Sequence, residues 1–136
     1  MIYLKLFENF TRHKDWENPD ENDNIFEIIF MSFLDISDKY NFEKVDDVNK
    51  SYINGTIYEI KYSKKREEYN LRIFFIDNLE GVSDDGRNLK KDLISDFHNF
   101  ISHLESFGLK CIMTTESGSL ILDFYISKTE NISFFN

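Results

Sequence analysis

The chain has very little of what several protein classes depend on. It carries one cysteine, Cys111, one proline and five glycines, and its 136 residues include neither alanine nor glutamine. A single cysteine cannot form an intramolecular disulfide, which excludes a disulfide-stapled secreted scaffold and favours a reducing compartment. So few glycines and prolines exclude collagen-like and low-complexity classes. We therefore expect a cytoplasmic protein.

Long apolar runs and surplus positive charge are missing as well. A run such as Ile28–Met31 is far shorter than the ~20 residues of a membrane span, and the residues after Met1 do not resemble a signal peptide. Lys and Arg number 16 against 25 Asp and Glu, a net charge of −9. Nucleic acids and anionic membranes attract proteins of the opposite charge balance. We therefore expect neither as a partner, whereas a protein with a basic surface remains allowed.

What the chain does have is aromatic residues. Phe occurs 14 times and Tyr seven times, which excludes wholesale disorder. A chain of 136 residues forms one domain that can bury its own core. Phe, Tyr, Met, Ile, Asn and Lys make up nearly half of the residues, and AT-rich codons encode all six. This bias indicates an AT-rich genome, such as many phages have.

Two helices are predicted from apolar residues at three- and four-residue spacing. The first spans Ile25 to about Lys39 and begins with a capping box, in which Asn24 is the N-cap and Glu27 reaches back to it. The second spans Leu89–Phe107 and ends at Gly108. Residues 1–24 are interpreted as an N-terminal arm, and residues 25–136 as a single α+β domain.

Strands are predicted where apolar and polar residues alternate or where turn residues bound a short apolar run. The predicted strands are Asn41–Val48, Thr56–Ser63, Tyr69–Ile76, Leu109–Thr115 and Ser119–Ser127. The order is α-β-β-β-α-β-β, and the fold class is α+β, with two helices on one face of a roughly five-stranded antiparallel sheet. A helix–strand–strand unit occurs twice in this order. An internal repeat and a chance likeness of such units both remain open.

The residues that most often form metal or nucleophile sites do not form a recognisable one here. His98 and His103 are five residues apart, about 140° around a helix, so they do not share a face. Cys111 stands at an apolar strand position without a neighbouring histidine, which favours a buried thiol. We therefore predict no metal site, and no catalytic residue or cofactor is assigned.

Two charged segments can each be interpreted either as a binding site or as a solvated part of the surface. Asp20, Asn22 and Asn24 alternate as in a calcium loop, but Ile25 stands where that loop needs glycine, so a solvated loop is favoured. Basic residues interleave with tyrosines around the central hairpin, which could bind a nucleic acid strand. A tip kept soluble by its charges is the favoured alternative. The hairpin residues are Lys61, Lys64, Lys65, Arg66 and Arg72, with Tyr58, Tyr62 and Tyr69.

Candidate partner-binding residues lie in three places. Phe134 and Phe135 make the C-terminal segment apolar, so it either docks on the domain or enters a partner's groove. Asp84 and Asp85 lie in an acidic loop, and Trp16 lies in the predicted arm. The absence of known catalytic motifs lowers the expectation of an enzyme. The alternative is a small-ligand-binding protein or enzyme with a site near the second helix and residues Asp77–Asn88.

The N-terminal peptide Ile2-Tyr-Leu-Lys-Leu-Phe-Glu-Asn-Phe10 resembles the opening of small accessory proteins of large tailed phages. Within it, Leu6-Phe7-Glu8 is similar to the Leu-x-Glu site of prohead proteases. The resemblance implies a viral source and the host-cell cytoplasm, and it assigns no catalytic residues. We therefore expect a non-enzymatic phage-type accessory protein that binds another protein, either as an inhibitor of a host or defence factor or as a virion-associated protein. Homo-oligomerisation is also allowed.

Overall fold

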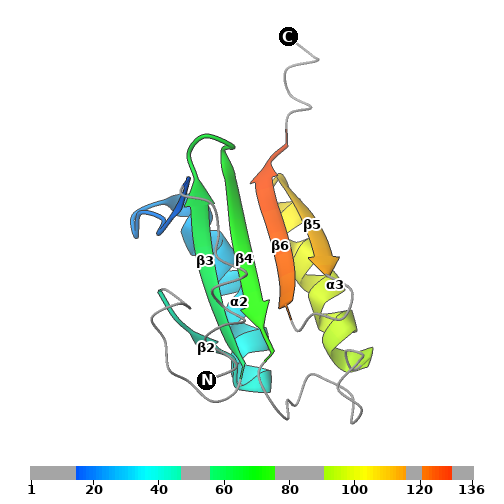
Figure 1. Cartoon of the computed structure of the whole chain (residues 1–136). Coiled ribbons are helices and arrows are strands. Elements are labelled where there is room, and N and C mark those ends of the chain that lie inside the picture. Colours follow the sequence, from blue (N-terminus) through cyan, green and yellow to red (C-terminus); the bar gives the residue numbers. More distant parts are fainter. Residues whose placement is uncertain (1–14, 47–55, 76–90, 116–120, 130–136) are drawn as a thin grey trace.

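A computed structural model describes residues 15–46, 56–75, 91–115 and 121–129 of the chain. Within these ranges, two helices and six strands form a single layered unit (Figure 1). In chain order they are β1 (Trp16–Glu17), α2 (Asn24–Tyr40), β2 (Glu43–Lys44), β3 (Ile57–Ser63), β4 (Glu68–Phe74), α3 (Lys91–Ser106), β5 (Leu109–Thr115) and β6 (Ile121–Lys128).

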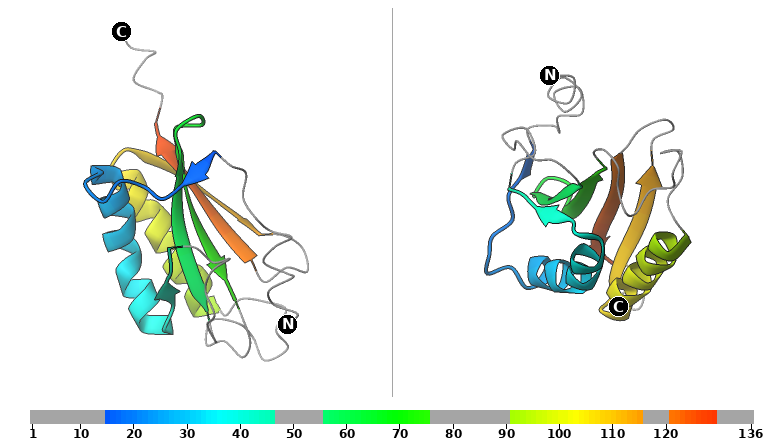
Figure 2. Two further views of the ribbon diagram at one scale, coloured as in Figure 1. Left: turned by 60° about the vertical axis from the view of Figure 1, so that its left-hand side comes forward. Right: turned by 90° about the horizontal axis from the view of Figure 1, so that it is seen from below.

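The strands form one sheet, and both helices cover the same face of it (Figure 2). The strand order is β1-β3-β4-β6-β5, and all neighbours in this order are antiparallel. Two hairpins, β3–β4 and β5–β6, are therefore joined through β4 and β6. The predicted α+β class, with two helices on one face of a mainly antiparallel sheet, is confirmed.

The strand count differs from the prediction at the N-terminal side. Trp16 pairs with Ser63, so part of the predicted arm belongs to the sheet. In the described part of the predicted strand Asn41–Val48, Glu43–Lys44 form the strand, which runs parallel to β3, and residues 47–48 lie outside the described ranges. It begins late because Asn41 adopts a left-handed conformation with φ 57° as it ends α2. The two helix–strand–strand units are thus not equivalent, because β2 runs parallel to β3 whereas β5 runs antiparallel to β6.

Helix α2 begins one residue earlier than predicted. Its N-cap is Asp23 rather than Asn24, and Asp23 Oδ1 accepts the amides of Ile25 at 2.8 Å and Phe26 at 3.5 Å. An ionised carboxylate both satisfies these orphan amides and interacts favourably with the positive end of the helix dipole. Asn24, which the sequence predicted as the cap, is the first helical residue.

The core between the helices and the sheet is built from aromatic rings. Phe33 of α2 is fully buried at its centre. Its ring lies 4.9 Å from that of Tyr58 on β3 and 5.3 Å from that of Phe100 on α3, both edge-on. Phe124 of β6 packs against Phe97 and Phe100 at 5.1 Å each. One cluster therefore holds both helices and the two central hairpins together.

The sheet face that turns away from the helices carries buried polar residues. Glu59, Asn70 and Asp123 are each at most 5% exposed. Arg72 holds Asp123 with two bonds, Nε to Oδ1 at 2.7 Å and Nη2 to Oδ2 at 3.2 Å. Such a fork-to-carboxylate pair fixes the register of β4 against β6, because a shifted strand would leave buried charge without a partner.

Candidate functional site

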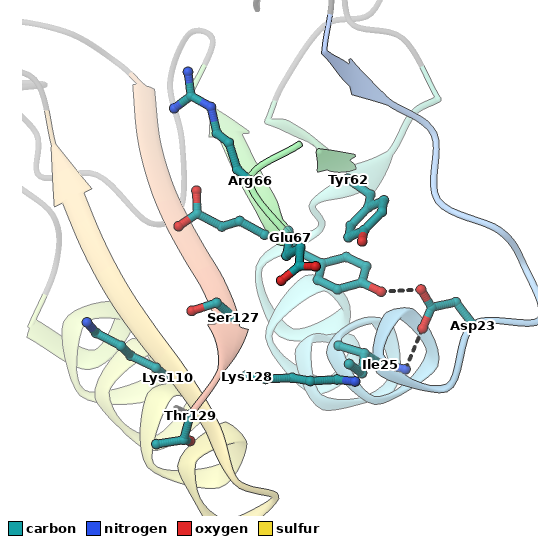
Figure 3. A pocket seen from close by; sticks show the side chains of 11 residues that line it. Asp23, Ile25, Tyr62, Arg66, Glu67, Lys110, Ser127, Lys128 and Thr129 are labelled. Atoms are coloured by element: carbon teal, nitrogen blue, oxygen red, sulfur yellow. Dashed lines mark hydrogen bonds between the residues drawn. The ribbon is translucent and has the colours of Figure 1, made fainter. Parts of the chain in front are cut away.

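A groove is hollowed into the described surface at the hairpin end of the sheet (Figure 3). Its volume is about 700 Å³. Three separate parts of the chain line it: the start of α2, the β3–β4 turn with its flanking residues, and the start of β5 beside the end of β6. The lining residues are Asp23, Ile25, Tyr62, Arg66, Glu67, Glu68, Tyr69, Lys110, Ser127, Lys128 and Thr129.

Asp23 and Tyr69 form the floor of this hairpin-end groove. The Tyr69 hydroxyl donates a hydrogen bond to Asp23 Oδ2, while Asp23 Oδ1 accepts the Ile25 amide (Figure 3). Burial, followed by the Asp23 carboxylate, raises the pKa of the Tyr69 phenol well above its usual range. The phenol therefore stays protonated and ties the start of α2 to β4. This hydrogen bond holds Asp23 and Tyr69 in place, and the protonated phenol does not act as a base.

Charges of both signs surround this floor. Arg66, Lys110 and Lys128 are exposed, as is Glu67. Glu68 is half-buried, and burial raises the pKa of its carboxyl although Arg66 and Lys110 oppose the shift. No salt bridge joins Lys110 or Lys128 to an acidic residue within the described ranges. The groove thus presents lysine ammonium groups and carboxylates side by side.

Trp16 lies next to the groove because its ring contacts Arg66, which is one of the lining residues. The Arg66 guanidinium sits 5.7 Å from the centre of the Trp16 ring, and its Nε bonds Asp15 Oδ2 at 3.3 Å. Asp15 also accepts the Ser63 hydroxyl at 3.2 Å. Burial is the largest single effect on the pKa of the Asp15 carboxyl and by itself would raise it. The contacts with Ser63 and Arg66 contribute to the opposing effects, and the pKa is lowered overall. Trp16 itself is half-exposed and packs 6.3 Å from the ring of Tyr125.

The polar groups that line the groove are hydroxyls, carboxylates, ammonium groups and one guanidinium. No histidine or cysteine is among its lining residues. Its hydroxyl groups belong to Ser127, Thr129 and the tyrosines, and Thr129 Oγ1 donates to the Gly108 carbonyl at 2.5 Å. Serine or threonine needs an adjacent base to act as a nucleophile. Among the lining hydroxyls, Ser127 stands directly opposite Glu68 in the β4–β6 pairing.

The partner-binding residues predicted from sequence are only partly placed. Trp16 is described and contacts Arg66 of the groove, but it is not itself a lining residue. Asp84, Asp85, Phe134 and Phe135 lie outside the described residues, and so does the loop Asp77–Asn88 of the alternative site. The sequence did not predict the groove itself, because its three walls are far apart along the chain. Two signals pointed to this region. The polar start of α2 was interpreted as a helix cap, and the hairpin cluster that includes Tyr62, Arg66 and Tyr69 was interpreted as a charged tip.

Histidine and cysteine do not converge on a site in the part of the chain that is described. His98 and His103 are exposed on α3, and no group of three metal-ligating side chains occurs among the described residues. Cys111 is a buried core residue, which confirms the predicted thiol. Burial, with a smaller effect of Glu105, raises its pKa to about 12.

Several basic residues of the central hairpin are engaged within the protein. Lys61 Nζ donates to Asn18 Oδ1 at 2.7 Å and to the Asp46 carbonyl at 2.6 Å. Arg66 bonds Asp15, and Arg72 bonds Asp123. Lys64 and Lys65, at the tip of the hairpin, are exposed. In the described part of the chain, no helix is long and apolar enough to cross a membrane.

Comparisons with known proteins give no family. No protein-family model and no curated protein matches the sequence. Among solved structures, the chain is similar to the Acinetobacter baumannii histidine kinase AdeS, with 12% sequence identity over 94% of this chain and 74% of that chain. The TM-score of this match is 0.34, which is too low to carry an argument about fold or function.

Proposed function

We propose that this chain is a non-enzymatic protein-binding module whose recognition site is the hairpin-end groove with Trp16 at its margin. In the setting that the N-terminal peptide and the composition predict, it acts as a phage-type accessory protein on a host, defence or virion protein. The net charge of −9 favours approach by a basic partner surface. The mixed charges of the groove then orient that partner.

The observation that carries this proposal is the composition of the groove and its margin. Trp, Tyr and Arg are the residues that dominate binding energy at protein interfaces. Here Tyr62 and Arg66 line the groove beside exposed lysines and carboxylates, and the half-exposed Trp16 contacts Arg66 at the margin. The absence of histidine and cysteine from the lining residues favours binding over nucleophilic catalysis.

The test is quantitative capture from host lysate with matched variants. Trp16→Ala is compared with Phe107→Ala, because Phe107 is an aromatic residue that is 52% exposed and lies outside the groove lining. Lys128→Glu is compared with Lys64→Glu, since both lysines are exposed and only the first lines the groove. We expect one protein to be captured by the wild type and both controls, and to be lost at least tenfold with the two groove variants.

Two results would contradict the proposal. One is that the wild type captures nothing above background. The other is that all four variants capture the same protein equally well, which would place binding elsewhere on the molecule. Far-UV circular dichroism of each variant shows that a lost interaction does not reflect a lost fold.

A further inference from the structure

We infer that strand β5 is a self-association edge, along which a second copy of this chain pairs antiparallel about a two-fold axis at Ile112. The inference concerns the sheet edge and does not rest on the function proposed above. It would make one sheet continuous through two molecules, with β5 of each copy at the centre.

The outer edge of β5 is open in the described part of the molecule. β5 is the last strand in the sheet order and pairs with β6 alone among the described strands (Figure 1). The Thr129 amide donates to the Gly108 carbonyl at 3.2 Å, which makes this opposed pair a hydrogen-bonded one. Antiparallel pairs alternate along a ladder. The backbone groups of Leu109, Cys111, Met113 and Thr115 therefore point away from β6.

This edge carries few of the features that normally prevent pairing. Natural edge strands are blunted by charges, prolines or bulges. β5 contains one charged residue, Lys110, no proline, and an unbroken register against β6. Ile112, at its midpoint, is 48% exposed, and Thr114 and Thr115 are exposed as well. A partner strand would cover apolar and uncharged side chains here.

The neighbouring side of helix α3 extends the apolar surface. Asp96 faces α2, because it accepts hydrogen bonds from Lys39 at 2.9 Å and Tyr40 at 2.8 Å. Ile94 and Ile101 lie roughly 160° and 140° around the helix from Asp96, so they face the opposite side. Both are half-buried, and α3 packs on β5. Pairing of two β5 strands brings these flanks of the two α3 helices together.

The sequence of β5 fits a second copy of itself. With the axis at Ile112, every residue of Leu109–Thr115 has a partner, and residues with outward backbone groups face each other, as hydrogen bonding requires. Lys110 then faces Thr114 of the other copy rather than its own counterpart, so no like charges meet. Cys111 faces Met113, and Ile112 faces Ile112, so the centre of the interface is apolar.

The first experiment measures molecular mass against concentration by sedimentation equilibrium. We expect the wild type to form a dimer, and Ile112→Lys to weaken dimerisation at least tenfold because two ammonium groups meet at the axis. Met31→Lys is the matched control, since Met31 is 56% exposed on α2, and it should dimerise like the wild type. A wild type that stays monomeric, or an Ile112→Lys variant that dimerises normally, would overturn the inference.

The second experiment tests the register by oxidative cross-linking in a Cys111→Ala background. Ile112→Cys places two thiols opposite each other in a non-hydrogen-bonded pair, where side chains are closest. It should cross-link at least tenfold faster than Lys110→Cys, whose thiol faces Thr114. Equal rates would show random collision and would overturn the pairing about Ile112.

Discussion

Glu68 lies half-buried at the groove, and its burial gives stability a definite dependence on pH. Because its pKa is raised in the folded state above the ordinary value of 4.5, the folded state holds this proton more tightly than the unfolded chain. Ionised Glu68 therefore costs stability above the folded-state pKa, and this cost is absent below the unfolded value.

We predict that Glu68→Gln raises the free energy of unfolding at about pH 7 and that the gain disappears near about pH 3. Urea unfolding at both pH values measures the difference. Glu67→Gln is the matched control, because Glu67 is adjacent, exposed and of the same charge. An equal gain for both variants would show an effect of net charge rather than of burial.

Cys111 offers a second test at the level of a single side chain. A thiol with a pKa of about 12 holds on the order of a thousandfold less thiolate at pH 8 than an exposed cysteine. We predict that iodoacetamide modifies native Cys111 at least a thousandfold more slowly than the urea-unfolded chain. Phe107→Cys in a Cys111→Ala background supplies an exposed thiol for comparison. Similar rates for both native thiols would contradict the buried position.

At the scale of elements, each helix is followed by a residue with positive φ, Asn41 after α2 and Gly108 after α3. Glycine adopts this conformation without strain, whereas asparagine does so at a small cost. Gly108 has φ 79°, and no atom lies within 4 Å of where a Cβ would stand. Gly108→Ala should therefore cost about 1 kcal/mol from backbone strain alone. Asn41→Gly, at φ 57°, should be neutral or slightly stabilising. Denaturant unfolding of both variants checks this, and a neutral Gly108→Ala would contradict it.

The helices were predictable because their apolar stripes repeat locally. Ile29, Phe33 and Ile36 follow one another at the four- and three-residue spacing that predicted the first helix, and all three are buried. The N-cap was misplaced by one residue, since Asp23 and Asn24 are equally good caps by residue type, and the bond from Tyr69 to Asp23 is not visible in the sequence. Strand β1 was missed because two residues in an acidic segment carry no periodicity. Its pairing partner, Ser63, is remote in sequence.

At the scale of the whole molecule, Phe33 of α2 joins α3 and the sheet, since its ring contacts Phe100, Tyr58 and Phe124. Phe33→Ala should cost about 3–5 kcal/mol, whereas Phe33→Leu should cost about 1–2 kcal/mol. The exposed Phe107→Leu is the control and should stay within about 0.5 kcal/mol of the wild type. Thermal unfolding measures all three. A Phe33→Leu variant as stable as the control would contradict the central place of this ring.

The candidate site was less predictable than the fold because it forms only after the layers assemble. Sequence reasoning could find Trp16 as an isolated aromatic residue, but not that Arg66 lies 5.7 Å from it. Strand register decides that Asp23 meets Tyr69 and that Glu68 lies near Lys110. Hydrophobic alternation has a period of two residues, so a shift of two residues would leave the same side chains in the core and the register undetermined.

The position of Trp16 has a practical consequence, because it is the one tryptophan in the chain. It lies beside the groove and outside the Phe33 cluster, packed against Arg66 and Tyr125. Its intrinsic fluorescence therefore reports the surroundings of the groove without any label. Binding there would change the emission while the circular dichroism of the protein stays constant, so ligand titrations can be followed optically in dilute solution.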